Sequence, residues 1–152
     1  MAPHLLAHLQ ARAASIRNRW ETLLRVEPVN GPLANPDALV HLIPDSLREI
    51  FATLAKPSKG PPPPRSAKIT LPDCDCGNNP YLAYFVAGQQ ALAETLVLLQ
   101  AELPKEERCQ GDLAELVHVV RRLAMSEIDT FCEICDHRGT ASKCRHASAV
   151  CR

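Results

Sequence analysis

The sequence predicts an all-α protein: a single domain of the four-helix-bundle type, with a proline-rich connection between its second and third helices. Two observations support this prediction. Apolar residues recur three and four positions apart in four segments of similar length, as on the buried face of an amphipathic helix. Stretches rich in Pro, Gly and Asn separate the first three segments, a polar stretch at residues 104–110 separates the third from the fourth, and no strand candidate is stronger than residues 67–71. Four such helices with one long connection are typical of a four-helix bundle or a related all-α fold.

The composition suits one domain spanning residues 1–152, with 22% charged and 46% hydrophobic residues. A formal net charge of zero argues against nucleic acid as a partner, because a protein that binds phosphates needs surplus Lys and Arg. No uninterrupted apolar run approaches the roughly 20 residues that span a bilayer, and residues 1–20 lack the uniform apolar region of a signal peptide. We therefore expect a cytoplasmic protein with no membrane partner.

The first helical pair is expected within residues 1–56. Its first helix covers residues 3–26, with Pro3 in the first turn. The second covers residues 36–55, with Asn35 as N-cap and Pro36 as first helical residue. The apolar stripes are Leu5, Leu9, Ala13, Ile16, Trp20 and Leu23, then Leu39, Ile43, Leu47, Ile50 and Leu54 with Phe51 beside it.

Pro44 lies inside the second predicted helix. Since proline cannot donate its backbone hydrogen bond, it should kink or split this helix, and Asp45 could cap the second piece. Residues 57–73 form a linker that contains four consecutive prolines and favours the extended polyproline II conformation. A docking peptide for an aromatic-grooved domain would have this composition too, but a stiff spacer is the simpler interpretation.

The second helical pair is a hairpin within residues 74–137, made of helices at 80–103 and 111–136. Its stripes are Leu82, Phe85, Gln89, Leu92, Leu96, Leu99 and Leu103, then Leu113, Val117, Val120, Ala124, Ile128, Phe131 and Cys135. Gln89 is the polar member, and we interpret it as a buried amide that fixes the helix register more readily than as a ligand contact. Residues 138–152 show no apolar periodicity and are expected to be an unstructured basic tail.

Two cysteine motifs flank this hairpin. Cys74 and Cys76 precede its first helix, and Cys132 and Cys135 lie in the last turns of its second. The helices are nearly equal in length, about 36 Å each at 1.5 Å per residue, and a short connection makes them antiparallel neighbours. The four thiols should therefore meet at one corner of the bundle. Cys109 belongs to the opposite end.

Four thiolates at this spacing predict a metal site that joins the ends of the hairpin. Zinc prefers four tetrahedral ligands, and clustered cysteines in a reducing compartment more often signal metal or redox chemistry than disulfides. An iron–sulfur cluster accepts the same four thiolates, and a dithiol redox switch or unrelated buried cysteines are further alternatives. The tail adds Cys144, His146 and Cys151 as secondary candidates for ligands, with His137 beside the second motif.

The first two helices resemble a known family. A tryptophan on a Leu-rich helix, Trp20, is followed by a Pro-containing loop and by a second helix that opens with Leu33-Ala34-Asn35-Pro36. This arrangement over residues 5–56 is similar to the helical N-terminal sensor domain of Rsb-type bacterial stress-response regulators. The resemblance implies an all-helical sensory module of bacterial type that acts on another protein, and it implies nothing about the cysteine motifs.

No spaced acid pair or nucleophile–base arrangement stands out, so we do not expect an enzyme. The expected function is a zinc-binding helical sensor or regulatory interaction module. The alternatives are a redox- or metal-responsive thiol or iron–sulfur sensor and, less favoured, a metal-handling protein. A protein partner is expected, and a homodimer is left open.

Overall fold

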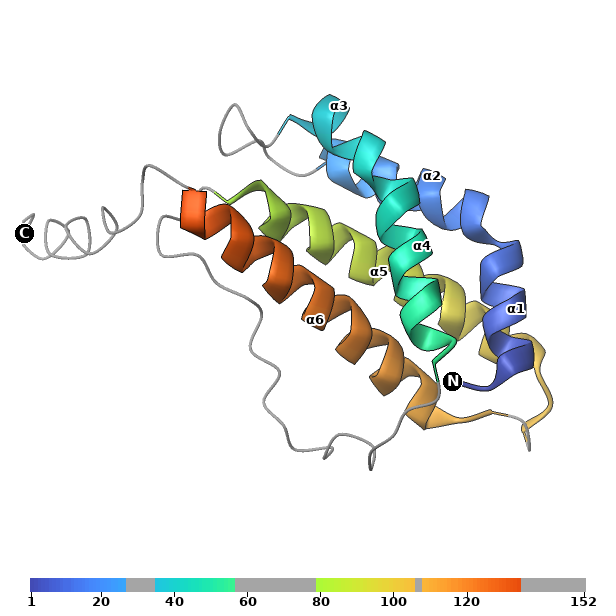
Figure 1. Ribbon diagram of the computed structural model, residues 1–152. Helices are drawn as coiled ribbons and strands as arrows, with labels where there is room; N and C mark the ends of the chain where they lie inside the picture. Colours follow the sequence, from blue (N-terminus) through green and yellow to red (C-terminus); the bar gives the residue numbers. More distant parts are fainter. Residues whose placement is uncertain (27–34, 57–78, 106–107, 135–152) are drawn as a thin grey trace, which may run out of the picture.

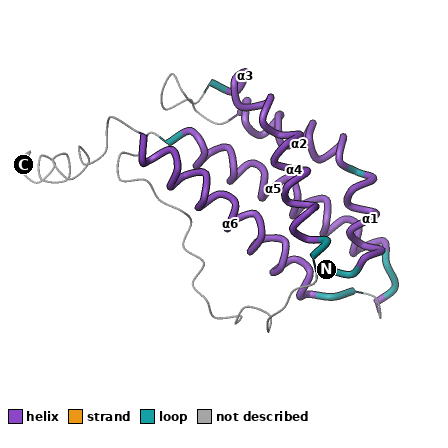
Figure 2. The backbone as a smooth tube through the Cα atoms, in the orientation of Figure 1, coloured by secondary structure: helices purple, strands orange, loops and turns teal. Residues whose placement is uncertain are grey.

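The computed structural model describes residues 1–26, 35–56, 79–105 and 108–134. Every regular element among these residues is a helix and none is a strand, which confirms the all-α prediction (Figures 1 and 2). The α-helices are α1 (Pro3–Ala11), α2 (Ala13–Val26), α3 (Pro36–Leu39), α4 (Ile43–Leu54), α5 (Pro80–Glu102) and α6 (Gln110–Ile134), with a 3₁₀ turn at Val40–Leu42.

The predicted helix over residues 3–26 is in fact two helices. The backbone leaves the helical region at Arg12, with φ −96° and ψ 13°, and α2 starts again at the next residue. The guanidinium of Arg12 binds the carboxylate of Glu102 at 2.7 Å. The predicted stripe members Ile16 and Trp20 of α2 are fully buried, whereas Leu24 is buried in place of Leu23, which is half-buried.

The split expected at Pro44 is confirmed. Residues before it form α3 and the 3₁₀ turn, and α4 begins at Ile43 with Pro44 in its first turn, where a missing N–H costs nothing. The expected capping role of Asp45 is wrong. The N-cap position of α4 is Leu42, without a side-chain bond, and Asp45 lies within the helix and pairs with Arg48 at 2.8 Å. The predicted N-cap Asn35 is confirmed, since its side chain accepts a hydrogen bond from Asp37 N.

Helix α5 is the central element of the bundle and packs against α1, α2 and α6. Its predicted stripe is largely confirmed: Phe85, Leu92, Leu96 and Leu99 are buried. A second buried set, facing α2, was not expected, and it consists of Tyr84, Ala87, Gly88 and Ala91. The helix therefore buries two faces, and small residues on one of them allow α2 to approach closely.

The directions of the helices explain the long connection. Helices α5 and α6 are antiparallel neighbours (Figure 1). Helices α4 and α5 run in the same direction, and Ser46 near the start of α4 is hydrogen-bonded to Tyr84 near the start of α5. The end of α4 and the beginning of α5 therefore lie at opposite ends of the bundle, which agrees with a long connection between them. Residues 57–73, the predicted linker, lie outside the described residues.

Helix α5 also meets the length and mean hydropathy of a membrane span, although its sequence contains no uninterrupted apolar run of that length. Within its most apolar 18-residue window, 44% of the residues are buried inside the bundle. The core helix of a bundle has the same composition, so this observation is weak evidence for a membrane span.

Candidate functional site

Of the four predicted metal ligands, only Cys132 is among the residues that the structure describes. Cys132 lies in the last turns of α6 and is half-buried. Cys74, Cys76 and Cys135 lie outside the described residues, as do His137 and the three secondary candidates in the tail, Cys144, His146 and Cys151. Among the residues that the structure describes, no group of three or more His, Cys, Asp or Glu side chains is arranged to hold a metal ion.

Asn79 is the residue that connects the two ends of the hairpin. It is the N-cap of α5, where its Oδ1 accepts a hydrogen bond from Tyr81 N at 3.0 Å. Its Nδ2 donates to the carbonyl oxygen of Ile128 at 3.3 Å and faces Cys132 Sγ at 3.6 Å. Only 5% of Asn79 is exposed. One amide therefore caps α5 and binds the last turns of α6, so the two helix ends are held together.

Sequence reasoning passed over Asn79, although a signal was present. The dipeptide Asn79-Pro80 repeats Asn35-Pro36, and the second of these was recognised as an N-cap followed by the first helical residue. The contact with α6 could not be found in the same way. It depends on how α5 and α6 are paired, and residues 79 and 132 are 53 positions apart.

Aromatic rings pack around this corner of the bundle. Tyr81 has its ring centroid 6.1 Å from those of Phe85 and Phe131, and the Tyr84 and Phe85 centroids are 5.0 Å apart in an edge-to-face arrangement. Burial, assisted by the nearby carboxylate of Glu127, raises the pKa of Tyr81 above its ordinary value. Cys132 is itself packed, partly buried, against the hydrophobic core.

Cys109 lies at the other end of the hairpin, directly before α6, and is exposed. Residues 109 and 132 are separated by nearly the whole of α6, about 35 Å at 1.5 Å per residue. This placement agrees with the exclusion of Cys109 from the predicted site.

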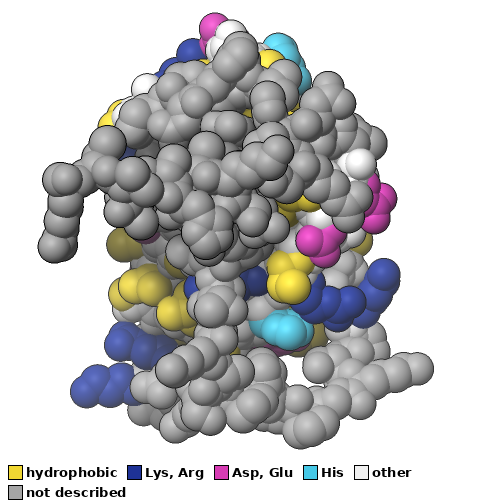
Figure 3. Space-filling model, turned by 90° about the vertical axis from the view of Figure 1, so that its left-hand side faces the viewer, with side chains coloured by type: hydrophobic (Ala, Val, Ile, Leu, Met, Phe, Trp, Pro, Cys, Tyr) yellow, Lys and Arg dark blue, Asp and Glu magenta, His cyan; other side chains and the backbone are white. Residues whose placement is uncertain are grey.

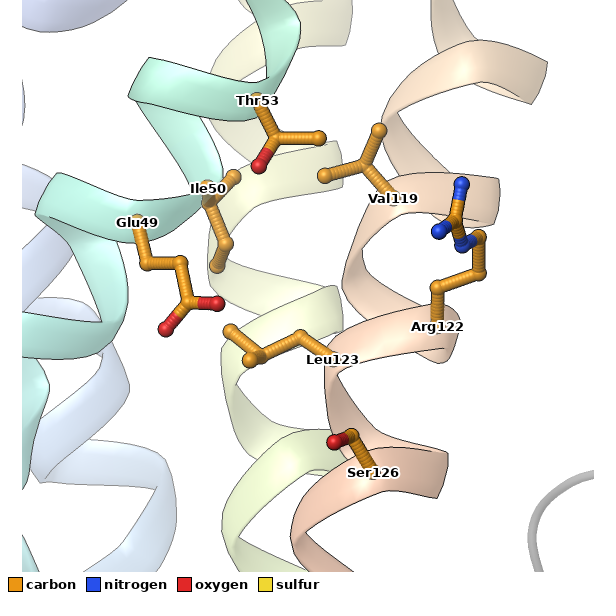
Figure 4. A pocket seen from close by; sticks show the side chains of 7 residues that line it. All are labelled: Glu49, Ile50, Thr53, Val119, Arg122, Leu123 and Ser126. Carbon is orange, nitrogen blue, oxygen red and sulfur yellow. The ribbon is translucent and has the colours of Figure 1, made fainter.

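Grooves open between the helices of the described part of the chain. The groove in Figure 4, about 190 Å³, lies between α4 and α6. Ile50 and Leu123 project into it from its two walls, and the carboxylate of Glu49 lies beside them (Figure 4). A second groove of about 150 Å³ separates α5 and α6, and a third of about 470 Å³ separates α2 and α4. None of the three brings together two carboxylates, or a nucleophile and a histidine, among its lining residues.

Gln89, the polar member of the α5 stripe, lines the second groove. It is half-buried, and its Oε1 accepts a hydrogen bond from Arg121 Nε of α6 at 2.9 Å. Desolvation lowers the pKa of Arg121 from its ordinary value. The amide thus pairs α5 with α6, as expected of a residue that fixes register, although it is less buried than predicted.

Comparison with known proteins finds no match: no family model, no curated sequence and no solved structure is similar to this chain. The resemblance of residues 5–56 to Rsb-type sensor domains therefore stays a prediction. The function of the chain has to be inferred from its own side chains.

Proposed function

We propose that this chain is a helical sensor or regulatory interaction module that binds one metal ion, zinc by ligand type, through Cys74, Cys76, Cys132 and Cys135. The ion would join the beginning of α5 to the end of α6. The observation that carries the proposal is the 3.6 Å contact between Asn79 Nδ2 and Cys132 Sγ.

This contact limits how far apart the two cysteine motifs can be. Cys76 precedes Asn79 by three residues, and three residues of extended chain span at most about 11 Å. The covalent chain therefore keeps Cys76 within about 11 Å of Asn79, which supports a common site for Cys76 and Cys132. Cys135 directly follows the last residue of α6, so the second motif reaches the same corner. Antiparallel pairing of α5 and α6 thus supports one site for both motifs.

The chemistry around Cys132 supports a bound ion as well. An amide N–H that points at a thiolate sulfur offsets part of its negative charge, as outer-shell donors do in metal–thiolate sites. Asn79 is itself oriented by its capping bond to Tyr81 N, so the donor is held in place before metal binds. The sensor or regulatory role follows the resemblance of residues 5–56, and in this proposal the ion stabilises the bundle and takes no part in catalysis.

The test is metal analysis of protein purified without oxygen. We expect about one equivalent of zinc per chain. Cys76→Ser and Cys132→Ser should each remove most of the metal, and the double variant should lose little more, because ligands of one ion are not additive. Cys109→Ser is the matched control and should keep full metal content, since Cys109 lies at the far end of α6.

A folded wild-type protein without metal would refute the proposal, and so would Cys76 and Cys132 effects that simply add. If the purified protein is brown and contains iron and sulfide, the group bound by these ligands is an iron–sulfur cluster and not zinc. The tail variants Cys144→Ser, His146→Ala and Cys151→Ser test the secondary ligands. If one of them loses metal as completely as Cys132→Ser does, that tail residue is a ligand of the ion.

A further inference from the structure

The groove between α2 and α4 has an apolar lining that continues the hydrophobic core. Leu47 and Phe51 of α4 belong to the core and are 5% and 8% exposed. Ala13 and Ala14 of α2 and Pro44 of α4 complete the apolar part of the lining. The groove has a volume of about 470 Å³, and cavities of about 300–1,000 Å³ are typical of small-molecule sites. Its size and lining therefore suit the apolar body of a small ligand.

Hydrophobic and basic side chains lie next to one another on the surface of the bundle, as the view in Figure 3 shows. The α2/α4 groove combines the two kinds, because Arg17 lines it from α2 and Arg48 lines it from α4. Its other polar lining residue is Asn18, and no acidic residue is among the described side chains that line it. Arg17 is exposed and makes no hydrogen bond or ion pair with any residue that the structure describes. Its guanidinium is therefore available to an anionic ligand.

Arg48 has a partner but keeps most of its hydrogen-bonding capacity. Its Nη2 donates to Asp45 Oδ1 at 2.8 Å, and the two side chains are 75% and 72% exposed. An exposed pair of this kind contributes little to stability. A guanidinium has five N–H donors, so this bond leaves donors of Arg48 for a ligand. Asp45 balances one of the two positive charges at the groove, and a ligand with a single negative charge would balance the other.

We propose that the α2/α4 groove binds an aliphatic monocarboxylate, with its hydrocarbon chain against Leu47 and Phe51 and its carboxylate bound by Arg17 and Arg48. Guanidinium groups bind carboxylates through charge-assisted hydrogen bonds. An inorganic anion would leave the apolar lining without a partner, and an uncharged apolar ligand would leave Arg17 without one. An amphipathic anion satisfies both parts of the groove. This site is separate from the metal site, because none of its residues is a proposed metal ligand.

The experiment is a titration of the full chain with octanoate, followed by NMR spectra of the methyl groups. We expect saturable shifts of the methyl signals of Ala13, Ala14 and Leu47, which line the groove. The methyl signals of Leu116 should change little, because Leu116 is buried in α6 and does not line the groove. Octanoate has about ten non-hydrogen atoms, so its dissociation constant should be roughly 0.1–1 mM.

Four variants test the role of charge. Arg17→Gln and Arg48→Gln should each weaken octanoate binding about 5-fold, because each removes a charge-assisted hydrogen bond at a partly solvent-exposed site. Asp45→Asn should strengthen binding about 2-fold, since Asp45 then no longer competes with the ligand for Arg48. Arg122→Gln is the matched control and should bind octanoate as the wild-type protein does. Arg122 is exposed, lines the α4/α6 groove instead, and makes no ion pair with any residue in the described part of the chain.

Octanol and inorganic phosphate test the two parts of the ligand separately. Both should bind at least about 5-fold more weakly than octanoate, because octanol lacks the charge and phosphate lacks the hydrocarbon chain. If octanol binds as tightly as octanoate, an uncharged apolar group is the occupant of the groove and the proposal is overturned. If phosphate does, the groove is a site for simple anions, and the proposal is overturned as well.

Two further results would contradict the proposal. One is the absence of shifts at Ala13, Ala14 and Leu47 up to about 10 mM octanoate, well above the expected dissociation constant. The other is an effect of Arg122→Gln as large as that of Arg17→Gln. All four replaced side chains are exposed, so the variants should fold. Their metal content should be unchanged, which separates this result from the test of the metal site.

Discussion

The indole ring of Trp20 lies on the Cα of Gly88 so closely that a Cβ atom at residue 88 would overlap the ring. The same ring donates its Nε1–H to the carbonyl oxygen of Tyr84 at 2.8 Å, one turn earlier on α5. Trp20 is fully buried. The missing side chain of Gly88 therefore lets a large residue of α2 reach the backbone of α5, and this contact sets the distance between the two helices.

The first prediction concerns Gly88→Ala. Helix propensity alone would make this substitution stabilising by about 1 kcal/mol. Because the new methyl group would overlap Trp20, we expect the free energy of unfolding to fall by about 2 kcal/mol instead, as in other overpacked cores. Urea unfolding measures the difference.

Gly111→Ala is the control for this prediction. Gly111 is exposed in the first turn of α6, and a Cβ there would lie 3.4 Å from Cys109 Sγ, an acceptable contact. This substitution should leave stability unchanged or raise it by up to about 1 kcal/mol. If both glycine variants behave alike, the Trp20 contact does not limit the packing of α2 on α5.

The second prediction concerns Tyr84→Phe. Tyr84 is fully buried, and its hydroxyl shares a hydrogen bond of 2.9 Å with Ser46 Oγ. Loss of this bond should cost about 1 kcal/mol near neutral pH. Burial raises the pKa of Tyr84 above its ordinary value of 10.0. The unfolded chain therefore releases this proton first, so the contribution of Tyr84 is complete below about pH 10 and is lost as the pH rises further.

Unfolding measured between about pH 8 and about pH 11 tests this dependence. The Tyr84→Phe variant should lose less stability over that range than the wild-type protein does. Tyr81→Phe is the comparison, because Tyr81 is only half-buried although its pKa is also raised. If Tyr84→Phe loses as much stability at alkaline pH as the wild-type protein does, the fold does not raise the pKa of the Tyr84 hydroxyl.

The third prediction concerns acid stability. Glu94 accepts hydrogen bonds from Arg19 Nε at 2.7 Å and from Gln90 Nε2 at 2.8 Å. These bonds lower the pKa of Glu94 from 4.5 to about 2. The carboxylate therefore stabilises the fold fully above about pH 4.5, and this contribution is lost as the pH falls toward 2. The effect should be small, because the ion pair is exposed to solvent.

Glu94→Gln should flatten the acid limb of the stability profile, and added salt should reproduce part of the effect at neutral pH. Glu49→Gln is the control, since Glu49 makes no ion pair with any residue that the structure describes. An equal change in both variants would mean that general surface charge, and not the Arg19 pair, determines the acid limb.

The fourth prediction compares two asparagine caps. Asn35→Ala removes only an exposed N-cap bond, which should cost about 1 kcal/mol. Asn79→Ala removes a cap and also the contacts with Ile128 and Cys132, and it should cost about 2–3 kcal/mol. Thermal unfolding of the two variants measures the difference in stability loss. The variants are comparable because each replaces an asparagine that directly precedes a proline.

Metal content distinguishes the two positions further. If Asn79 supports the proposed site, Asn79→Ala should lower metal affinity by 10-fold or more, as roughly expected for an outer-shell donor, while Asn35→Ala should leave it unchanged. Equal metal affinity in both variants would limit the role of Asn79 to joining α5 and α6.

Much of the helical framework can be predicted from the sequence because it depends on local physics. The predicted boundaries 80–103 agree closely with α5, Pro80–Glu102, since Asn79-Pro80 begins a helix and the apolar stripe continues it without interruption. Pro44 divides its helix as expected, since a residue without an N–H cannot continue the hydrogen-bond pattern. The proximity of the two ends of the hairpin follows from the nearly equal lengths of its helices and the short connection between them.

Other features were decided by tertiary structure. An apolar stripe indicates that a face is buried but not what covers it, so the second buried face of α5 became visible only with α2 in place. The helical pattern of the sequence does not explain why residue 88 is a glycine. The reason is the close contact with Trp20, which the structure shows. The Asn79–Cys132 contact likewise joins residues that are far apart in sequence. Local propensities therefore determined where the helices are, and packing between helices determined which side chains meet.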